Sequence, residues 1–91
     1  MKGPVQQEME ALLSRAFSPI DLRVINESDQ HAGHAGGGQE SHFQIHMSSE
    51  LFRGLKSLER HRRVHSVLRC LLDAGLHALT LKLYAPGEIL E

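Results

Sequence analysis

The chain has 91 residues, with ten Lys and Arg against eleven Asp and Glu, and a formal net charge of -1. This length suffices for one compact domain and leaves no room for a second hydrophobic core. The near-neutral charge excludes the global positive field of a typical nucleic-acid-binding protein, so any basic surface must be local. The single cysteine, Cys70, excludes an internal disulfide framework and a zinc site built from cysteine pairs.

The amino-terminal segment 1–17 contains one lysine before its first acidic residues and has no long apolar run. We therefore expect neither a signal peptide nor a membrane span, and no membrane partner. Apolar residues recur in this segment at three- and four-residue spacing, which predicts an amphipathic helix that begins just after Pro4 and stops at Ser18-Pro19. A bacterial cytoplasmic protein is the expected class, with the mitochondrial matrix as the alternative.

Two alternating stretches, 20–26 and 41–48, have the period of half-buried strands, and we expect them to pair antiparallel. His42 and His46 fall on the less buried face of the second strand. The stretch between the strands, 27–40, is rich in glycine and lacks bulky apolar side chains, which predicts a flexible loop too long for a tight hairpin turn. Loops of this kind commonly carry function.

The patterns in the second half of the sequence predict two helices and a third strand. Ser49 and its neighbours are a plausible cap for a short helical turn at Leu51-Phe52, and Gly54 closes it. A longer helix opens at Ser57 and ends before Gly75. Its expected apolar stripe is Leu58, His61, Val64, Val67, Leu68 and Leu71, with Arg60, Arg62, Arg63 and Arg69 mostly off it. Alternation over 78–84 predicts the last strand, and 85–91 forms the tail. The order α-β-β-α-α-β describes a small α+β domain with helices on one face of a three-stranded sheet.

Histidine is unusually frequent, with seven in the chain. Because imidazole binds metals, this favours a metal or cluster hypothesis over a surface scatter of histidines, above all for His31 and His34 in the glycine-rich stretch and His77 at a strand boundary. His61 lies on the apolar stripe and is interpreted as a buried structural histidine. The remaining histidines, His42, His46 and His65, are interpreted as surface residues, and Cys70 as a small buried hydrophobe.

Four segments in a fixed order carry a family resemblance: VINESDQH before the glycine-rich stretch, ESHF, SSELFRGLKSLERHRRV and GLHAL. Together they make residues 5–86 similar to the BolA family. The resemblance implies one BolA-like domain over 1–91, with a type II KH-like α+β fold that agrees with the element order above. One departure lies in the tail, where Glu88 is followed by Ile89 and the family often has Glu-Trp.

The resemblance also implies a function. BolA-like proteins bind monothiol glutaredoxins and share a bridging [2Fe-2S] cluster with them and glutathione. On the BolA side the implied ligands are His77 of the HAL motif and His31 of the glycine-rich stretch, with His34 as the alternative loop ligand. We expect an adaptor in iron-sulfur trafficking or iron regulation that holds no cluster by itself and is a monomer or weak dimer.

A second function class is a DNA-binding transcriptional regulator that uses the basic helix 57–72. The residues that favour it, or an acidic protein partner, are Arg53, Lys56, Arg60, Arg62, Arg63 and Arg69. Against DNA stand the net negative charge and the lack of a GXXG phosphate clamp. An enzyme is not expected, because the sequence has no paired catalytic carboxylates near its histidines, no nucleophile motif and no phosphate-cradling loop.

Overall fold

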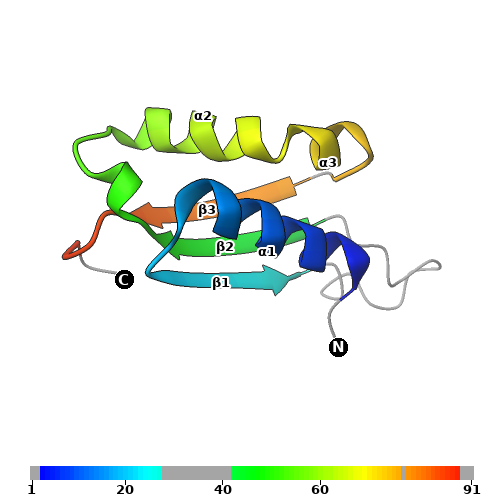
Figure 1. Ribbon diagram of the computed structural model, residues 1–91. Helices are drawn as coiled ribbons and strands as arrows, with labels where there is room; N and C mark the ends of the chain where they lie inside the picture. The colour runs from blue at the N-terminus through cyan, green and yellow to red at the C-terminus, as the bar shows by residue number, and fades with distance from the viewer. Residues whose placement is uncertain (1–2, 28–41, 77, 89–91) are drawn as a thin grey trace.

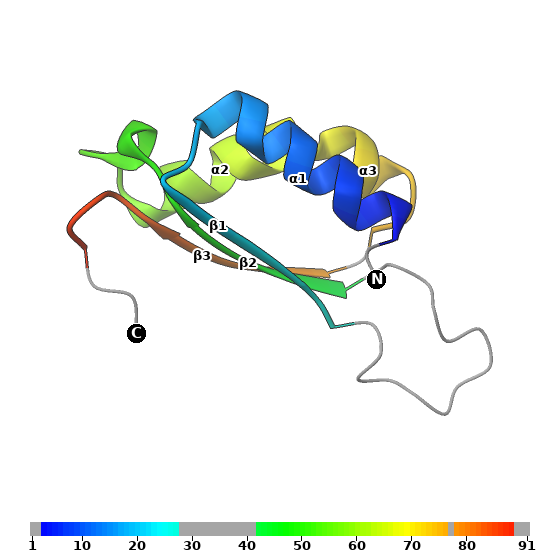
Figure 2. The same cartoon turned by 60° about the horizontal axis from the view of Figure 1, so that its bottom comes forward.

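The computed structural model describes residues 3–27, 42–76 and 78–88. Its elements are α1 (Pro4–Phe17), β1 (Asp21–Asn26), β2 (His42–Ser48), the short 3-10 helix η2 (Glu50–Phe52), α2 (Ser57–Val67), α3 (Arg69–Asp73) and β3 (Ala78–Tyr84). The three α-helices lie on one face of the sheet (Figure 1), and a turned view shows no described helix on the other face (Figure 2). The α+β fold and the element order predicted from the sequence are therefore confirmed. None of the described helices is long and apolar enough to cross a bilayer.

The sheet has the strand order β1-β2-β3. As predicted, β1 and β2 are antiparallel, with Val24 opposite Ile45. The pairing of β2 with β3 is parallel, with Ile45 opposite Leu81. Consequently β1 ends where β2 and β3 begin. We call this edge, at Asn26, His42 and Ala78, the loop end of the sheet, and the opposite edge the tail end.

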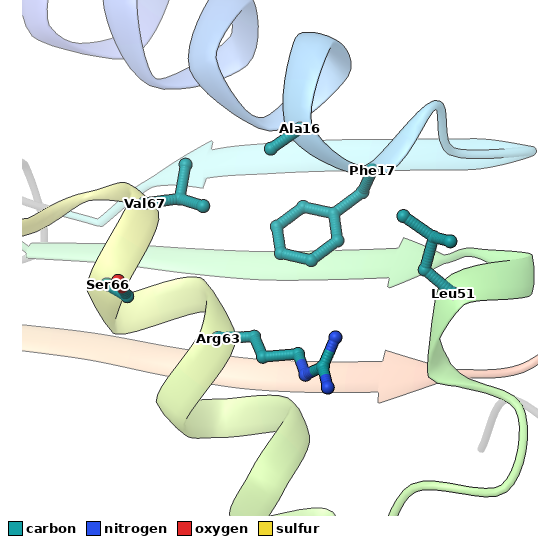
Figure 3. A pocket seen from close by; sticks show the side chains of 6 residues that line it. All are labelled: Ala16, Phe17, Leu51, Arg63, Ser66 and Val67. Atoms are coloured by element: carbon teal, nitrogen blue, oxygen red, sulfur yellow. The ribbon is translucent and has the colours of Figure 1, made fainter.

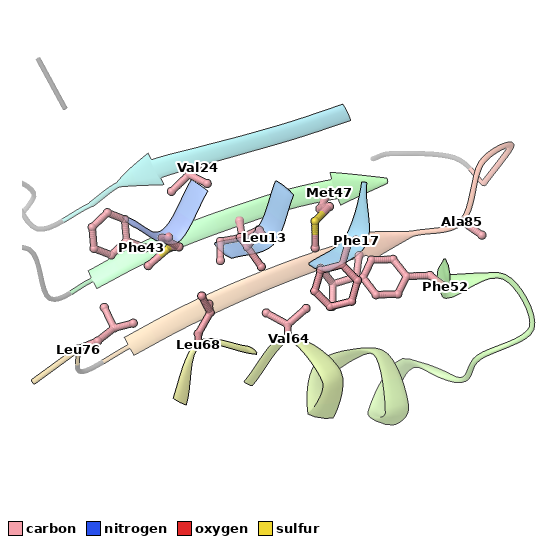
Figure 4. Close-up of a cluster of buried hydrophobic side chains, with 13 residues drawn as sticks. Leu13, Phe17, Val24, Phe43, Met47, Phe52, Val64, Leu68, Leu76 and Ala85 are labelled. Carbon is pink, nitrogen blue, oxygen red and sulfur yellow. The ribbon is translucent and has the colours of Figure 1, made fainter. Parts of the chain in front are cut away.

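The hydrophobic core fills the space between the sheet and the helices (Figure 4). Alternate residues of β2 point into it, since Phe43, Ile45 and Met47 are buried between half-buried polar neighbours. The remaining buried apolar residues come from the other elements and their flanks: Met9, Leu13, Phe17, Val24, Phe52, Val64, Leu68, Leu76, Leu83 and Ala85. This side-chain alternation leaves the polar residues of β2 on the face without helices.

Helix α1 begins with Pro4, whose fixed φ suits the first helical position, and ends at Ser18, which adopts a left-handed φ of 42°. Its buried side chains are Gln6, Met9, Leu13 and Phe17, which follow helical spacing. Gln6 is the polar member of this stripe, and its Nε2 donates a hydrogen bond of 2.9 Å to the Val24 carbonyl. The amide therefore satisfies its own burial and ties α1 to β1.

The long helix predicted from Ser57 begins there, but its predicted continuity is wrong. It breaks at Leu68, which has φ -96° and ψ 11°, so α2 and α3 are separate helices. Leu68 is fully buried, and the break lets Leu71 and Leu72 of α3 pack against the same core. The N-cap of α2 is Lys56, which makes no side-chain capping hydrogen bond.

The buried stripe of α2 is also rotated from the predicted one. Leu58 is 62% exposed, whereas the Arg60 side chain is only 11% exposed and lies on the same line as Val64 and Leu68. His61 is half-buried rather than buried. Cys70 is exposed, contrary to the prediction, because α3 presents its leucines to the core instead.

Candidate functional site

The loop end gathers chain segments that are far apart in the sequence. The Glu27 amide donates a hydrogen bond of 2.8 Å to the His42 carbonyl, so β1 and β2 stay paired up to the edge of the described residues. His42 lies opposite Ala78 in the parallel register. The described residues that flank 28–41 and the first residue of β3 thus meet at one edge of the sheet.

The described residue just before position 77 is anchored in the fold. Leu76 is buried in the core, and its amide donates a hydrogen bond of 3.1 Å to the Leu71 carbonyl. Gly75 before it has a φ of 125°, a conformation that a residue with a Cβ adopts only with strain. The described neighbours of position 77, Leu76 and Ala78, are therefore fixed by burial on one side and by strand pairing on the other.

The three predicted cluster ligands, His31, His34 and His77, lie outside the described residues. Within the described ranges, no group of three or more His, Cys, Asp or Glu side chains could hold a metal ion. His42 is the described imidazole at the loop end, and its register partner is Ala78. The exposed thiol of Cys70 belongs to α3, which leads into β3 (Figure 1). Imidazole and thiolate are both ligand types that an iron-sulfur cluster accepts.

The six basic residues predicted to bind DNA or a partner divide into three groups. Lys56, Arg62 and Arg69 are exposed, and the described part of the chain places no carboxylate in ion-pair contact with them. Arg53 and Arg63 are partly neutralised by acidic neighbours of their own segments, Glu50 at 2.7 Å and Glu59 at 3.3 Å. Arg60 is mostly buried and binds groups of other segments of the fold.

Arg60 joins α2 to the tail end of the sheet. Its Nε donates to the Leu55 carbonyl at 2.9 Å, and its Nη1 donates to the Leu83 carbonyl at 3.1 Å. Both Nη atoms bind the Glu88 carboxylate, at 2.7 and 3.0 Å, and the guanidinium lies 5.9 Å from the Phe52 ring centroid. Sequence patterns gave no signal for this role, because Arg60 and Glu88 are 28 residues apart.

The carboxylate of Glu88 is held in its ionised form. The hydrogen bonds from Arg60 lower the pKa of Glu88 from its ordinary 4.5 to about 2, and the hydrogen bond from the Ala85 amide, at 2.9 Å, contributes to the same lowering. The contact with Glu88 raises the pKa of Arg60 above its ordinary range. This pair is therefore a structural anchor at the tail end.

A hollow of about 270 Å³ opens between α1, η2 and α2. It is lined by Ala16, Phe17, Leu51, Arg63, Ser66 and Val67, as Figure 3 shows. Phe17 ends α1 and Leu51 belongs to η2, which follows β2, so the hollow lies toward the tail end on the helical side. It does not coincide with the described neighbours of the predicted ligands.

Comparison with known proteins places this fold and these motifs in one family. Residues 13–88 match the model of the BolA-like protein family. An uncharacterized protein in the cobS 5' region of Sinorhizobium is 45% identical over 85 residues, which cover 90% of this chain and 91% of that protein. The protein named DNA-binding transcriptional regulator BolA in Vibrio cholerae is 42% identical over 84 residues, 92% of this chain and 77% of that one.

A solved structure agrees with the sequence comparison. The BolA domain of SufE1 from Arabidopsis thaliana superposes with a TM-score of 0.88 and 34% sequence identity, and the match covers 98% of this chain and 100% of that domain. The chain is a small α+β domain of the BolA type. It belongs to the BolA-like protein family.

Proposed function

We propose that this BolA-like chain is a non-catalytic adaptor that binds a monothiol glutaredoxin and shares a bridging [2Fe-2S] cluster with it, in iron-sulfur trafficking or iron regulation. His77 and His31 are the proposed ligands from this chain, with His34 as the alternative to His31. The observation that carries the proposal is the meeting of Glu27, His42 and Ala78 at one edge of the sheet. Two ligands from separate parts of the sequence need such a meeting point.

In this proposal, the role of the described residues is to position the ligands. Buried Leu76 and paired Ala78 fix the chain on both sides of the HAL histidine, and a ligand on a rigid support loses little entropy when it binds iron. The cluster is the cargo, and imidazole ligation in place of thiolate raises its reduction potential. A shared cluster asks for only two ligands from this chain, since the glutaredoxin and glutathione supply the others.

The test is anaerobic cluster reconstitution of this chain with a monothiol glutaredoxin and glutathione, followed by visible absorption and circular dichroism. We expect a spectrum distinct from that of glutaredoxin alone, lost or altered in His77→Ala and His31→Ala. His65→Ala is the matched control, because this exposed histidine of α2 bonds only the His61 carbonyl within the described residues, at 3.0 Å. Cys70→Ser controls for capture of iron by the exposed thiol.

Two outcomes would count against the adaptor. One is a glutaredoxin-only spectrum in every mixture. The other is a new spectrum that survives in His77→Ala and disappears in Cys70→Ser, since the thiol would then be the ligand. If His34→Ala alters the spectrum and His31→Ala does not, the adaptor proposal stands and the loop ligand is His34.

A DNA-binding regulator is the second candidate, favoured by the name of the Vibrio cholerae relative and by the exposed charges of Lys56, Arg62 and Arg69. Each basic residue that binds a DNA phosphate adds about 0.9 to the slope of log K against log salt. For this candidate we expect Arg62→Gln/Arg69→Gln to reduce the slope for duplex DNA by nearly twice this amount. Fluorescence anisotropy at several salt concentrations measures the slope. An unchanged slope would exclude this surface as the DNA-binding surface.

A further inference from the structure

One face of the sheet carries no described helix (Figure 2), and polar residues of β2 line it. We call it the open face. On β2 it consists of His42, Gln44, His46 and Ser48, which alternate with the buried residues of the core face. The strand register determines which residues of β1 and β3 stand beside each of them.

One line across the open face is entirely basic. Arg23 of β1 lies opposite His46, and His46 lies opposite Lys82 of β3. Neighbouring strands are about 4.8 Å apart, so the three Cα atoms fall within about 10 Å. Arginine and lysine side chains are long enough for both to reach a group above the central imidazole. We call these three residues the cationic row.

The cationic row is electrostatically unbalanced. The like charges of Arg23 and Lys82, which stand on either side of β2, repel each other weakly across two strand spacings of about 4.8 Å each. Within the described ranges, no carboxylate makes an ion pair with Arg23 or Lys82. An acidic residue on the same face, Asp21, stands opposite Ser48 in the next row rather than in this one. An anion above the row would remove this repulsion.

The histidine in the centre of the row contacts Gln44 of the same strand. Its Nε2 lies 2.9 Å from Oε1 of Gln44.

We propose that the cationic row binds the phosphate group of a small phosphomonoester. A phosphomonoester carries close to two negative charges at neutral pH, which match the two permanent cations Arg23 and Lys82. A carboxylate would neutralise only one of the two cations. The hydroxyl of Tyr84 is two residues beyond Lys82 on the same face, at the border of the site.

The rows on either side of the site argue against a nucleic-acid backbone as the occupant. The row toward the loop end is Ile25, Gln44 and Thr80, and the row toward the tail end is Asp21, Ser48 and Tyr84. Neither row carries a positive charge, and one carries a negative charge. A polyanion needs a continued basic stripe, whereas a single phosphate needs only one row.

The test is a titration of the ¹⁵N-labelled chain with inorganic phosphate, AMP and adenosine at low ionic strength, followed by NMR. We expect phosphate and AMP, but not adenosine, to shift the amides of Arg23, His46 and Lys82. Equal affinities for phosphate and AMP would identify free phosphate as sufficient, and tighter AMP binding would identify a nucleotide ligand. Both results support the phosphate site.

Matched variants distinguish the site from general charge. Arg23→Gln/Lys82→Gln removes the two permanent cations of the row, and Arg62→Gln/Arg69→Gln removes the same charge from α2 and α3. We expect at least a tenfold loss of phosphate affinity in the first variant and less than a twofold change in the second, with both folded by circular dichroism. Equal losses, shifts centred on α2, or no shifts would overturn the proposal. So would a single-stranded oligonucleotide that binds the row far more tightly than AMP.

Discussion

The two ends of the sheet are built in different ways. At the tail end, polar side chains connect different elements. Ser49 Oγ donates to the Phe17 carbonyl at 2.7 Å and accepts from the Leu51 amide at 3.1 Å. The Arg60 side chain binds the Glu88 carboxylate. At the loop end, the contacts include the backbone pairing of the strands and the burial of Leu76. The comparison shows that the Arg60–Glu88 anchor and the proposed ligands are placed at opposite edges of the sheet. Variants at the tail end should therefore lower the free energy of unfolding and leave cluster capture at the loop end intact.

The largest expected effect at the tail end comes from Phe52→Ala. The Phe52 side chain is fully buried, and its ring centroid lies 5.1 Å from that of Phe17. Loss of this ring should lower the free energy of unfolding by about 3–5 kcal/mol, because it removes apolar burial and leaves a cavity. Urea denaturation measures this loss of unfolding free energy. The control is Leu51→Ala one residue earlier, where the side chain is 52% exposed, and an equal loss in both variants would contradict the assignment.

A smaller loss is expected for Arg60→Met. Methionine keeps an unbranched apolar stem beside Phe52 but removes every donor to Leu55, Leu83 and Glu88. We expect a loss of about 1–3 kcal/mol, the range for hydrogen bonds that involve a charged group and for acceptors left without a partner. Arg62→Met, on the exposed side of the same helix, should stay within about 0.5 kcal/mol of wild type. A similar loss in the two variants would mean that Arg60 stabilises the helix and not the tail end.

Local sequence patterns predicted the elements on both sides of this comparison better than the contacts that join them. Alternating and helical patterns of apolar residues predicted α1 and all three strands, because local side-chain periodicity follows the buried face directly. The same periodicity failed for Leu58 and Arg60, where the helix buries a cation and exposes a leucine. That inversion depends on Glu88, a partner far away in the sequence that no local pattern connects to Arg60.

For the candidate sites, too, local sequence patterns did not predict which residues come together. The resemblance, and not the periodicity, predicted His77, His31 and His34 as ligands, and these assignments remain predictions because the residues lie outside the described ranges. The exposure of Cys70 was missed because it depends on the break at Leu68. The cationic row was missed as well. Its three residues are adjacent only through strand register, and the direction of the β2–β3 pairing was not predicted.

The smallest effect depends on pH. The pKa of Glu88 is lowered from 4.5 to about 2 in the folded state, so the ionised carboxylate stabilises the fold relative to the unfolded chain. That contribution is fully present above the ordinary pKa of 4.5 and is lost as the pH falls through about 2. Glu88→Gln should therefore be less stable than wild type at pH 7, and the gap should narrow below pH 4.5 because only the wild type loses a charge.

Urea denaturation of the two proteins at several pH values, from neutral down to about 3, measures this gap. Glu59→Gln is the control, because Glu59 forms an exposed ion pair with Arg63 at 3.3 Å, and such pairs contribute little. Its difference from wild type should be small throughout. A Glu88→Gln gap that stays constant across the pH range would show that the hydrogen-bond geometry at Ala85, and not the charge, holds the tail end. The contrast between the two ends would then depend on hydrogen bonding alone, and Arg60→Met would be expected to lose less than the range given above.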